Sequence, residues 1–90
     1  MSDQDTATVL AFPCEFPIKV LGRRRAGFAQ TIVDIVKRHA PEFDAATLEM
    51  RASREATYLS LTLTIHATSR EQLDGLYREL CDHPMVTMVL

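Results

Sequence analysis

Three consecutive arginines are the residues of this sequence best suited to hold a ligand. Arg23, Arg24 and Arg25 follow Gly22 and come just before Gly27 and a segment with helical periodicity. A helix N-terminus favours an anion, and arginine adds bidentate hydrogen bonds to phosphate or carboxylate. The five residues therefore form a candidate anion-binding or ligand-binding loop. The alternative is a solvated basic loop, since no glycine-rich phosphate cradle is present.

A second candidate surface is the polar side of the stretch YLSLTLTIHAT, residues 58–68. Strict alternation predicts a half-buried strand, and its polar side carries Tyr58, Ser60, Thr62, Thr64 and His66. RNA-binding sheets stack bases on aromatic rings in their middle strands, whereas threonines hold the middle positions here. RNA binding is therefore the least favoured partner class. Plain solvent exposure, a small molecule or a protein contact remain for this face.

The histidines and cysteines do not form a catalytic or metal-binding pattern. His39, His66 and His83 are far apart, and no cysteine or carboxylate completes a ligand set around them. Cys14 and Cys81 lack metal-ligand spacing and are expected to be free thiols. Nucleophile-elbow and P-loop motifs are also absent from the sequence. We therefore predict a protein that is not an enzyme and has no catalytic residue, metal or cofactor.

Length and charge limit the class of protein further. The chain has 90 residues with a formal charge of −2, which suits one domain and gives no general attraction to nucleic acid or anionic membranes. No apolar run approaches the ~18 residues of a membrane span, and the acidic start lacks the features of a signal peptide. The prediction is a cytoplasmic protein with a mobile tail at residues 1–11 and one domain at residues 12–90.

The first half of the chain contains a strand, a helix and a second strand. Alternation predicts a strand in EFPIKVL, residues 15–21, which Gly22 ends. Pro17 must lie where its missing N–H is not needed. A stripe of apolar residues predicts a helix in RAGFAQTIVDIVKRHAP, residues 25–41, and Pro41 stops it. ATLEMRA, residues 46–52, predicts a short strand with Leu48 and Met50 facing the core.

The second half contains the long alternating strand, a helix and a final strand. Ser69 with Gln72, or Thr68 with Glu71, has the spacing of a capping box that begins a helix. The apolar residues of this helix are Leu73, Leu76, Tyr77 and Leu80, and Pro84 follows its end. The last six residues, MVTMVL, predict a strand with Val86, Met88 and Leu90 facing inward.

The order β-α-β-β-α-β predicts an α+β ferredoxin-like sandwich. Two right-handed crossovers joined by a hairpin give a four-stranded antiparallel sheet of order 4-1-3-2, with both helices on one face. The leucines of residues 58–68 then lie beneath the helices. The polar residues of that strand lie on the face that the helices leave bare, because antiparallel sheets commonly keep one face in water.

The final strand is a candidate interface because it lies at a sheet edge. Its outward residues are predicted to be Met85, Thr87 and Val89, and it lacks the lysine, proline or bulge that protects most natural edges. A protein partner or a second copy of the chain could pair with this edge. The alternative is that TVLAFP, residues 8–13, covers it.

Many residues of the chain resemble the YbeD-like family of small bacterial proteins of unknown function. The resemblance is carried by Phe12-Pro13, Lys19-Val20, Gly22, RHAP at 38–41, Tyr58, Ser60, Ala67-Thr68, Glu71-Gln72, LY at 76–77, EL at 79–80 and MVL at 88–90. It implies a fold similar to the ACT domains that regulate metabolic enzymes, and RAGFAQTIVDIVKRH is similar to the ACT turn and helix. The triplet Arg23-Arg24-Arg25 is more basic than the family pattern.

The resemblance and the candidate surfaces together predict a binding protein. We expect a non-catalytic regulatory or protein-interaction module that binds a small molecule, a protein partner or a second copy. Family members are often encoded near lipoate-attachment genes, so the resemblance also implies an accessory role in lipoate metabolism as an alternative.

Overall fold

The computed structural model of the protein describes residues 11–90. Nearly all of the predicted tail, and part of the segment expected to cover the last strand, lie outside these residues. The strands are β1 (Cys14–Arg23), β2 (Glu49–Ala52), β3 (Tyr58–Ala67) and β4 (Val86–Val89), and the helices are α2 (Phe28–His39) and α3 (Arg70–Asp82), with a 3-10 turn at Ala45–Thr47.

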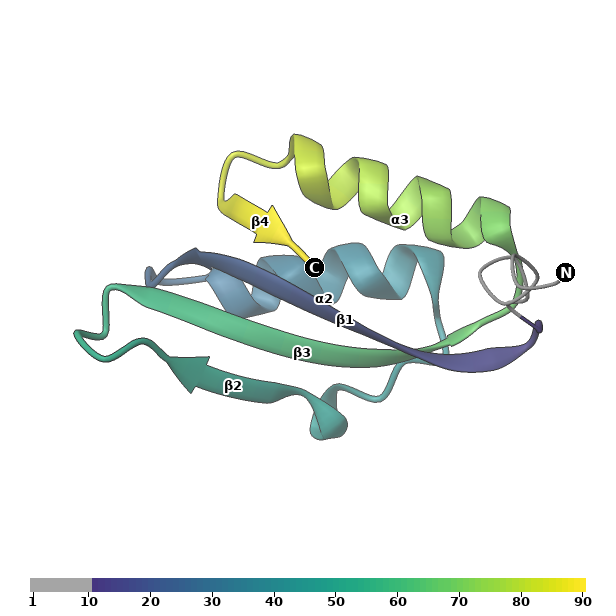
Figure 1. Ribbon diagram of the computed structural model, residues 1–90, viewed down its shortest axis with the longest axis horizontal. Coiled ribbons are helices and arrows are strands. Elements are labelled where there is room, and N and C mark those ends of the chain that lie inside the picture. Colours follow the sequence, from purple (N-terminus) through teal and green to yellow (C-terminus); the bar gives the residue numbers. More distant parts are fainter. Residues whose placement is uncertain (1–10) are drawn as a thin grey trace, which may run out of the picture.

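The four strands form one antiparallel sheet of order β2-β3-β1-β4. This is the predicted order, counted from the other edge, and α2 and α3 lie on the same face of the sheet (Figure 1). β1 and β3 are the long central strands and pair over ten residues, from Cys14 opposite Ala67 to Arg23 opposite Tyr58. The ferredoxin-like fold predicted from the element order is confirmed.

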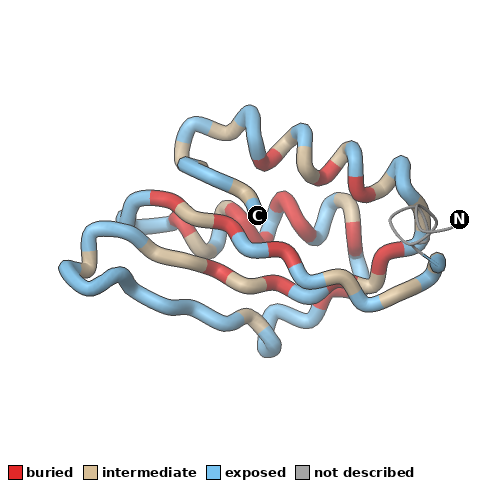
Figure 2. Tube along the Cα trace, viewed as in Figure 1, coloured by how far each residue is buried: buried red, intermediate tan, exposed pale blue. Residues whose placement is uncertain are grey.

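The core lies between the two central strands and the two helices, where Figure 2 shows the buried segments. The predicted inward residues of β3 are confirmed, since Leu61, Leu63 and Ile65 have no exposed surface. The buried residues of the helices are Phe28, Ile32, Val33, Ile35 and Val36 on α2, and Leu73, Leu76 and Leu80 on α3. Apolar residues at helical spacing thus pack against alternating apolar residues of the strands.

The beginning of α3 follows the capping prediction in one of its two forms. The hydroxyl of Ser69 accepts a hydrogen bond from the N–H of Gln72 at 3.1 Å. The amide oxygen of Gln72 accepts one from the N–H of Thr68 at 2.6 Å, and its amide nitrogen donates to the carbonyl of His39 at 2.9 Å. The Gln72 side chain therefore satisfies backbone groups at the start of α3 and at the end of α2.

Polar side chains also join the two helices. The carboxylate of Glu79 on α3 pairs with Arg38 and accepts a hydrogen bond from His39, whose Nε2 lies 2.7 Å from Glu79 Oε1. Hydrogen bonds from His39 and then from Arg38 lower the pKa of Glu79 below its ordinary value. The pair is partly exposed, so its stabilising effect is modest.

Replacing Glu79 with glutamine is expected to lower the free energy of unfolding by less than about 1 kcal/mol near neutral pH. Because the folded state lowers the pKa of Glu79, its contribution is present above the carboxyl's ordinary pKa of 4.5 and is lost as the pH falls through the lower folded value. Urea unfolding of E79Q and the parent at several pH values should therefore converge in acid. The control is Glu55→Gln, and a difference between E79Q and the parent that persisted in acid would contradict the assignment.

The second strand differs from the prediction at its start and in its burial. Residues 45–47 form a 3-10 turn because Asp44 accepts a hydrogen bond from the N–H of Ala46, so β2 begins only at Glu49. Met50 lies opposite Leu61 on the helix-covered side, but it is 57% exposed. The prediction that Met50 joins the core is wrong, because the helices do not extend over this edge strand (Figure 2).

The last strand contains a β-bulge that reverses the predicted orientation of its end. Val89 lies opposite Val20 and Met88 opposite Leu21, but Gly22 lies opposite Val86, so Thr87 is the extra residue. Val86 and Val89 consequently face the core. Met88 is 49% and Leu90 61% exposed, and the prediction that they face inward is wrong. The prediction that this edge lacks a bulge is also wrong.

The part of β1 that β4 does not cover has a residue that hinders pairing with another strand. Lys19 exchanges two backbone hydrogen bonds with Leu90, and within residues 11–90 no strand pairs with β1 beyond that point on the β4 side. Backbone groups two residues apart point the same way in a strand, so Pro17 faces this unpaired edge. Its missing N–H is therefore not needed, as predicted, and it interrupts the row of donors that another strand could pair with.

Candidate functional site

The predicted anion-binding loop separates into a buried residue and an exposed turn. Gly22 is buried inside β1 rather than in the loop, and the strand continues to Arg23 instead of ending at the glycine. A β-carbon on Gly22 would lie 2.6 Å from ring atoms of Phe28 and closer still to the carbonyl oxygen of Met85. Gly22 therefore permits the close packing of β1 against α2 and the segment before β4.

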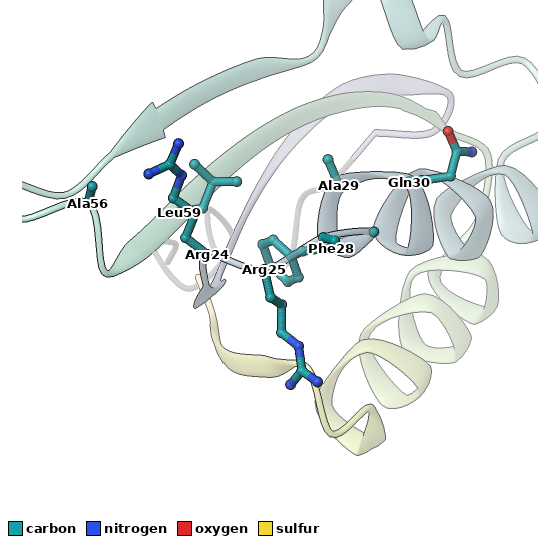
Figure 3. Close-up of a pocket in the computed structure, with 9 residues that line it drawn as sticks. Arg24, Arg25, Phe28, Ala29, Gln30, Ala56 and Leu59 are labelled. Carbon is teal, nitrogen blue, oxygen red and sulfur yellow. The ribbon is translucent and has the colours of Figure 1, made fainter.

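The three arginines point in different directions. The guanidinium of Arg23 lies over the ring of Tyr58, 5.6 Å from its centroid, on the bare sheet face. Arg24 extends toward Leu59, whereas Arg25 extends toward the connection between α3 and β4 (Figure 3). The sequence triplet is thus not one cluster, and only Arg24 and Arg25 line the hollow before α2.

This hollow has the backbone geometry of an anion site. It is open and has a volume of about 670 Å³. The residues that line it are Arg24, Arg25, residues 26–30, Ala56 and Leu59. Gly27 precedes α2 with a positive φ of 83° and provides no side-chain cap. Within residues 11–90, no hydrogen bond engages the N–H groups of Ala29 and Gln30. These donors belong to the positive end of the helix dipole.

The charges at the hollow match these donors. No ion pair joins Arg24 or Arg25 to a carboxylate within residues 11–90. The N–H of Arg24 donates to the carbonyl of Thr57 at 2.8 Å, which fixes the loop against the start of β3. The hollow can therefore present two backbone donors to a phosphate or carboxylate, with the cationic side chains of Arg24 and Arg25 on either side of them.

The second candidate surface lies where the alternation predicted it. The side chains of Tyr58, Ser60, Thr62, Thr64 and His66 lie on the sheet face opposite the helices, with Lys19 and Glu49 on either side of Thr62. Thr87, which was predicted to face outward on the last strand, lies at the bulge. His66 Nδ1 is 3.7 Å from a carboxylate oxygen of Glu15, so this end of the face carries a histidine–carboxylate pair.

Sequence reasoning missed the apolar half of this face. Leu21 lies beside Ser60 and Met88, and Leu90 pairs with Lys19, so all three apolar residues share the bare face with Tyr58. The alternation of residues 15–21 could have placed Leu21 there. No signal in MVTMVL indicated the bulge that turns Met88 and Leu90 to the same side.

The candidate edge residues do not share a surface. Met85 precedes β4 and packs half-buried against the core, and Val89 faces the core as well. Only Thr87 is exposed, at the bulge. Pairing of a partner with the edge stays a prediction, but these three side chains cannot provide one continuous contact.

The histidines and cysteines are dispersed. His39 contacts Glu79, His66 is near Glu15, and Nδ1 of His83 accepts a hydrogen bond from the N–H of Met85 at 3.1 Å. Among residues 11–90, no three histidine, cysteine or acidic side chains gather around a point where a metal could bind. Cys14 and Cys81 are free thiols, as expected.

Similar structures place this architecture among the ferredoxin-like, ACT-like α+β folds. One is a solution structure of an H. pylori protein, with a TM-score of 0.74, 13% identity, and coverage of 91% of this chain and 86% of that one. Another is the ACT domain from GTP pyrophosphokinase of Chlorobium tepidum, with a TM-score of 0.66, 17% identity, and coverage of 86% and 83%. At these identities the likeness shows the fold alone.

The chain belongs to the family described as "Protein of unknown function (DUF493)", whose profile matches residues 7–90. A UPF0250 protein of Nitrosomonas europaea is 58% identical over 83 residues, which cover 92% of this chain and 95% of that protein. A UPF0250 protein of a Janthinobacterium species is 52% identical over 91 residues, with full coverage of both chains. The YbeD-like resemblance is confirmed. Within residues 11–90, no helix is long and apolar enough to cross a membrane.

Proposed function

We propose that the protein is a non-catalytic regulatory module that binds a small anionic ligand in the hollow before α2. The observation that carries the proposal is that Arg24 and Arg25, which have no ion-pair partner within residues 11–90, flank the unbonded N–H groups of Ala29 and Gln30. A phosphate or carboxylate would accept hydrogen bonds from the helix, and the positive charges of both arginines would attract it.

The likeness to an ACT domain supports a regulatory role without identifying the ligand. A hollow of this volume is within the usual range for small-molecule sites. Two backbone donors with an arginine on either side favour a ligand with several oxygen atoms, such as a phosphate ester or a dicarboxylate. The accessory role in lipoate metabolism stays a prediction from the family resemblance, as does RNA binding from the sheet topology.

The test is a titration of the 15N-labelled chain with inorganic phosphate and, separately, with acetate, followed by NMR. The amides of Gly27, Ala29 and Gln30 should shift in a saturable way, because these groups line the hollow. The double variant Arg24→Ser/Arg25→Ser should lose the shifts. Arg23→Ser is the matched control and should keep them, because Arg23 lies over Tyr58 instead. Unaltered shifts in the double variant would refute the site.

A further inference from the structure

We propose that the bare sheet face around Leu21 is a docking surface for an acidic amphipathic helix of a partner protein. The first observation is a concentration of exposed apolar side chains. Four large apolar residues of the described chain are strongly exposed, and three of them, Tyr58, Met88 and Leu90, lie on this face at 38%, 49% and 61% exposure. Soluble proteins rarely leave such residues grouped in water unless the patch meets a partner.

The sheet register brings these residues together. Leu21 is the half-buried centre, with Met88 beside it on β4 and Ser60 on β3. Leu90 lies two residues further along the chain than Met88 and exchanges backbone hydrogen bonds with Lys19. A mostly apolar hollow of about 290 Å³ opens here, lined by Leu21, Leu90, Tyr58, Lys19 and Arg51, among others. The surface thus has an apolar centre that a partner's side chains can enter.

The charges around this centre are mainly positive. Lys19, Arg23 and Arg51 all lie on the bare face beside the apolar residues, while Glu49 is the acidic residue of that half. Within residues 11–90, none of the three cations forms an ion pair with a carboxylate. An apolar centre with a charged rim is typical of protein interfaces, and the sign of this rim selects an acidic partner.

The dimensions of the face favour a helix as the docking element. Neighbouring strands are about 4.8 Å apart, so the distance from Met88 on β4 to Arg51 on β2 is roughly 14 Å. A helix of about ten residues spans that length at 1.5 Å per residue. Its apolar residues at positions i, i+3, i+4 and i+7 would meet Leu21 and its neighbours. Carboxylates flanking that stripe would meet Lys19 and Arg51.

The test uses the full chain and a synthetic helical peptide of about 14 residues, with a leucine stripe flanked by glutamates. NMR titration should shift the amides of residues 19–23, 51–60 and 86–90 in a saturable way. A peptide with lysine in place of every glutamate should bind at least about tenfold more weakly. Arg24 and Arg25 belong to the hollow before α2 and not to this face. The Arg24→Ser/Arg25→Ser variant should therefore bind the acidic peptide like the parent.

Two variants with a matched control locate the contact. Met88→Glu and Arg51→Glu should each weaken binding of the acidic peptide by at least about tenfold, a loss expected for a central or charge-paired contact. Met50→Glu should leave it unchanged, because Met50 is a similarly exposed methionine on the other sheet face. The unperturbed NMR spectrum of each variant away from the substitution reports that it is folded.

Several outcomes would overturn the proposal. One is a lack of saturable shifts up to about 1 mM peptide, a concentration that corresponds to weak binding. Another is equal affinity for the acidic and the basic peptide. Shifts confined to the helices would do the same. So would a dimer that the parent forms in sedimentation and Met88→Glu does not, because a second copy would then occupy the face. Tight peptide binding seen only after removal of residues 1–10 would make that segment the occupant instead.

Discussion

Replacing Leu61 with alanine is expected to lower the free energy of unfolding by about 2–5 kcal/mol. Leu61 has no exposed surface and lies in the central strand β3, with Val20 and Met50 as its cross-strand neighbours. Removing its side chain loses apolar burial and leaves a cavity between the sheet and the helices. For a domain of this size, the melting temperature should fall by at least about 10 °C, measurable by circular dichroism.

The matched control is Thr64→Ala, on the same strand but on the bare face. Thr64 is exposed and is separated from the core by the sheet itself, so its truncation should change the free energy of unfolding by less than about 0.5 kcal/mol. Equal losses in the two variants, or no loss in L61A, would mean that the core does not lie on the side assigned to it.

Replacing Gly22 with alanine is expected to destabilise the protein by about 1–3 kcal/mol or more, although it adds one methyl group. The new β-carbon would lie 2.6 Å from the ring of Phe28, a fully buried core residue, and would meet the backbone carbonyl of Met85. Backbone cannot move aside as a flexible side chain can. Urea unfolding should show the loss, and amide hydrogen exchange should show β4 opening more often.

Gly75 provides the control for the same substitution. It lies inside α3, and a β-carbon there would be 3.4 Å from the nearest ring atom of His39, an ordinary contact distance. Alanine should therefore stabilise the helix by about 0.5–1 kcal/mol, because glycine is the poorer helix former. If G22A were as stable as G75A, Gly22 would not be required for close packing.

The fold was predictable because its strongest signals are local and periodic. Alternation over residues 58–68 identified a central strand, and the apolar stripes that include Phe28 and Leu76 identified both helices. The spacing of Ser69 and Gln72 predicted the start of α3. These patterns reflect backbone geometry that repeats every 2 or 3.6 residues, so each can be recognised without knowledge of distant contacts.

The orientation of the edges was not predictable in the same way. A single extra residue, Thr87, reverses the faces of Met88 and Leu90, and it shows only in the pairing of β4 with β1, not in the local pattern of the sequence. The exposure of Met50 depends on how far the helices extend over β2. Both errors concern tertiary contacts at sheet edges, where alternation alone does not fix burial.

The placement of the candidate site residues was predictable in part. The basic triplet indicated the loop that borders the hollow before α2, because positive charge before a helix is visible in sequence. The sequence did not show that the three arginines belong to different surfaces. That separation arises because the strand continues through Arg23 and ends there. Arg23 consequently belongs to the bare sheet face, and Arg24 and Arg25 belong to the hollow before α2. The two surfaces proposed for recognition therefore lie on different sides of the molecule, each with its own cations.

The register of the sheet determines which residues lie on each proposed surface. Cross-strand nuclear Overhauser effects measure this register most directly. We expect contacts that join Arg23 with Tyr58, Val20 with Val89, and Gly22 with Val86, with Thr87 unpaired. A regular ladder, in which Gly22 lies opposite Val86, Leu21 opposite Thr87 and Val20 opposite Met88, would contradict it. Met88 and Leu90 would then lose their place on the bare face, and the apolar centre assigned to recognition would no longer exist.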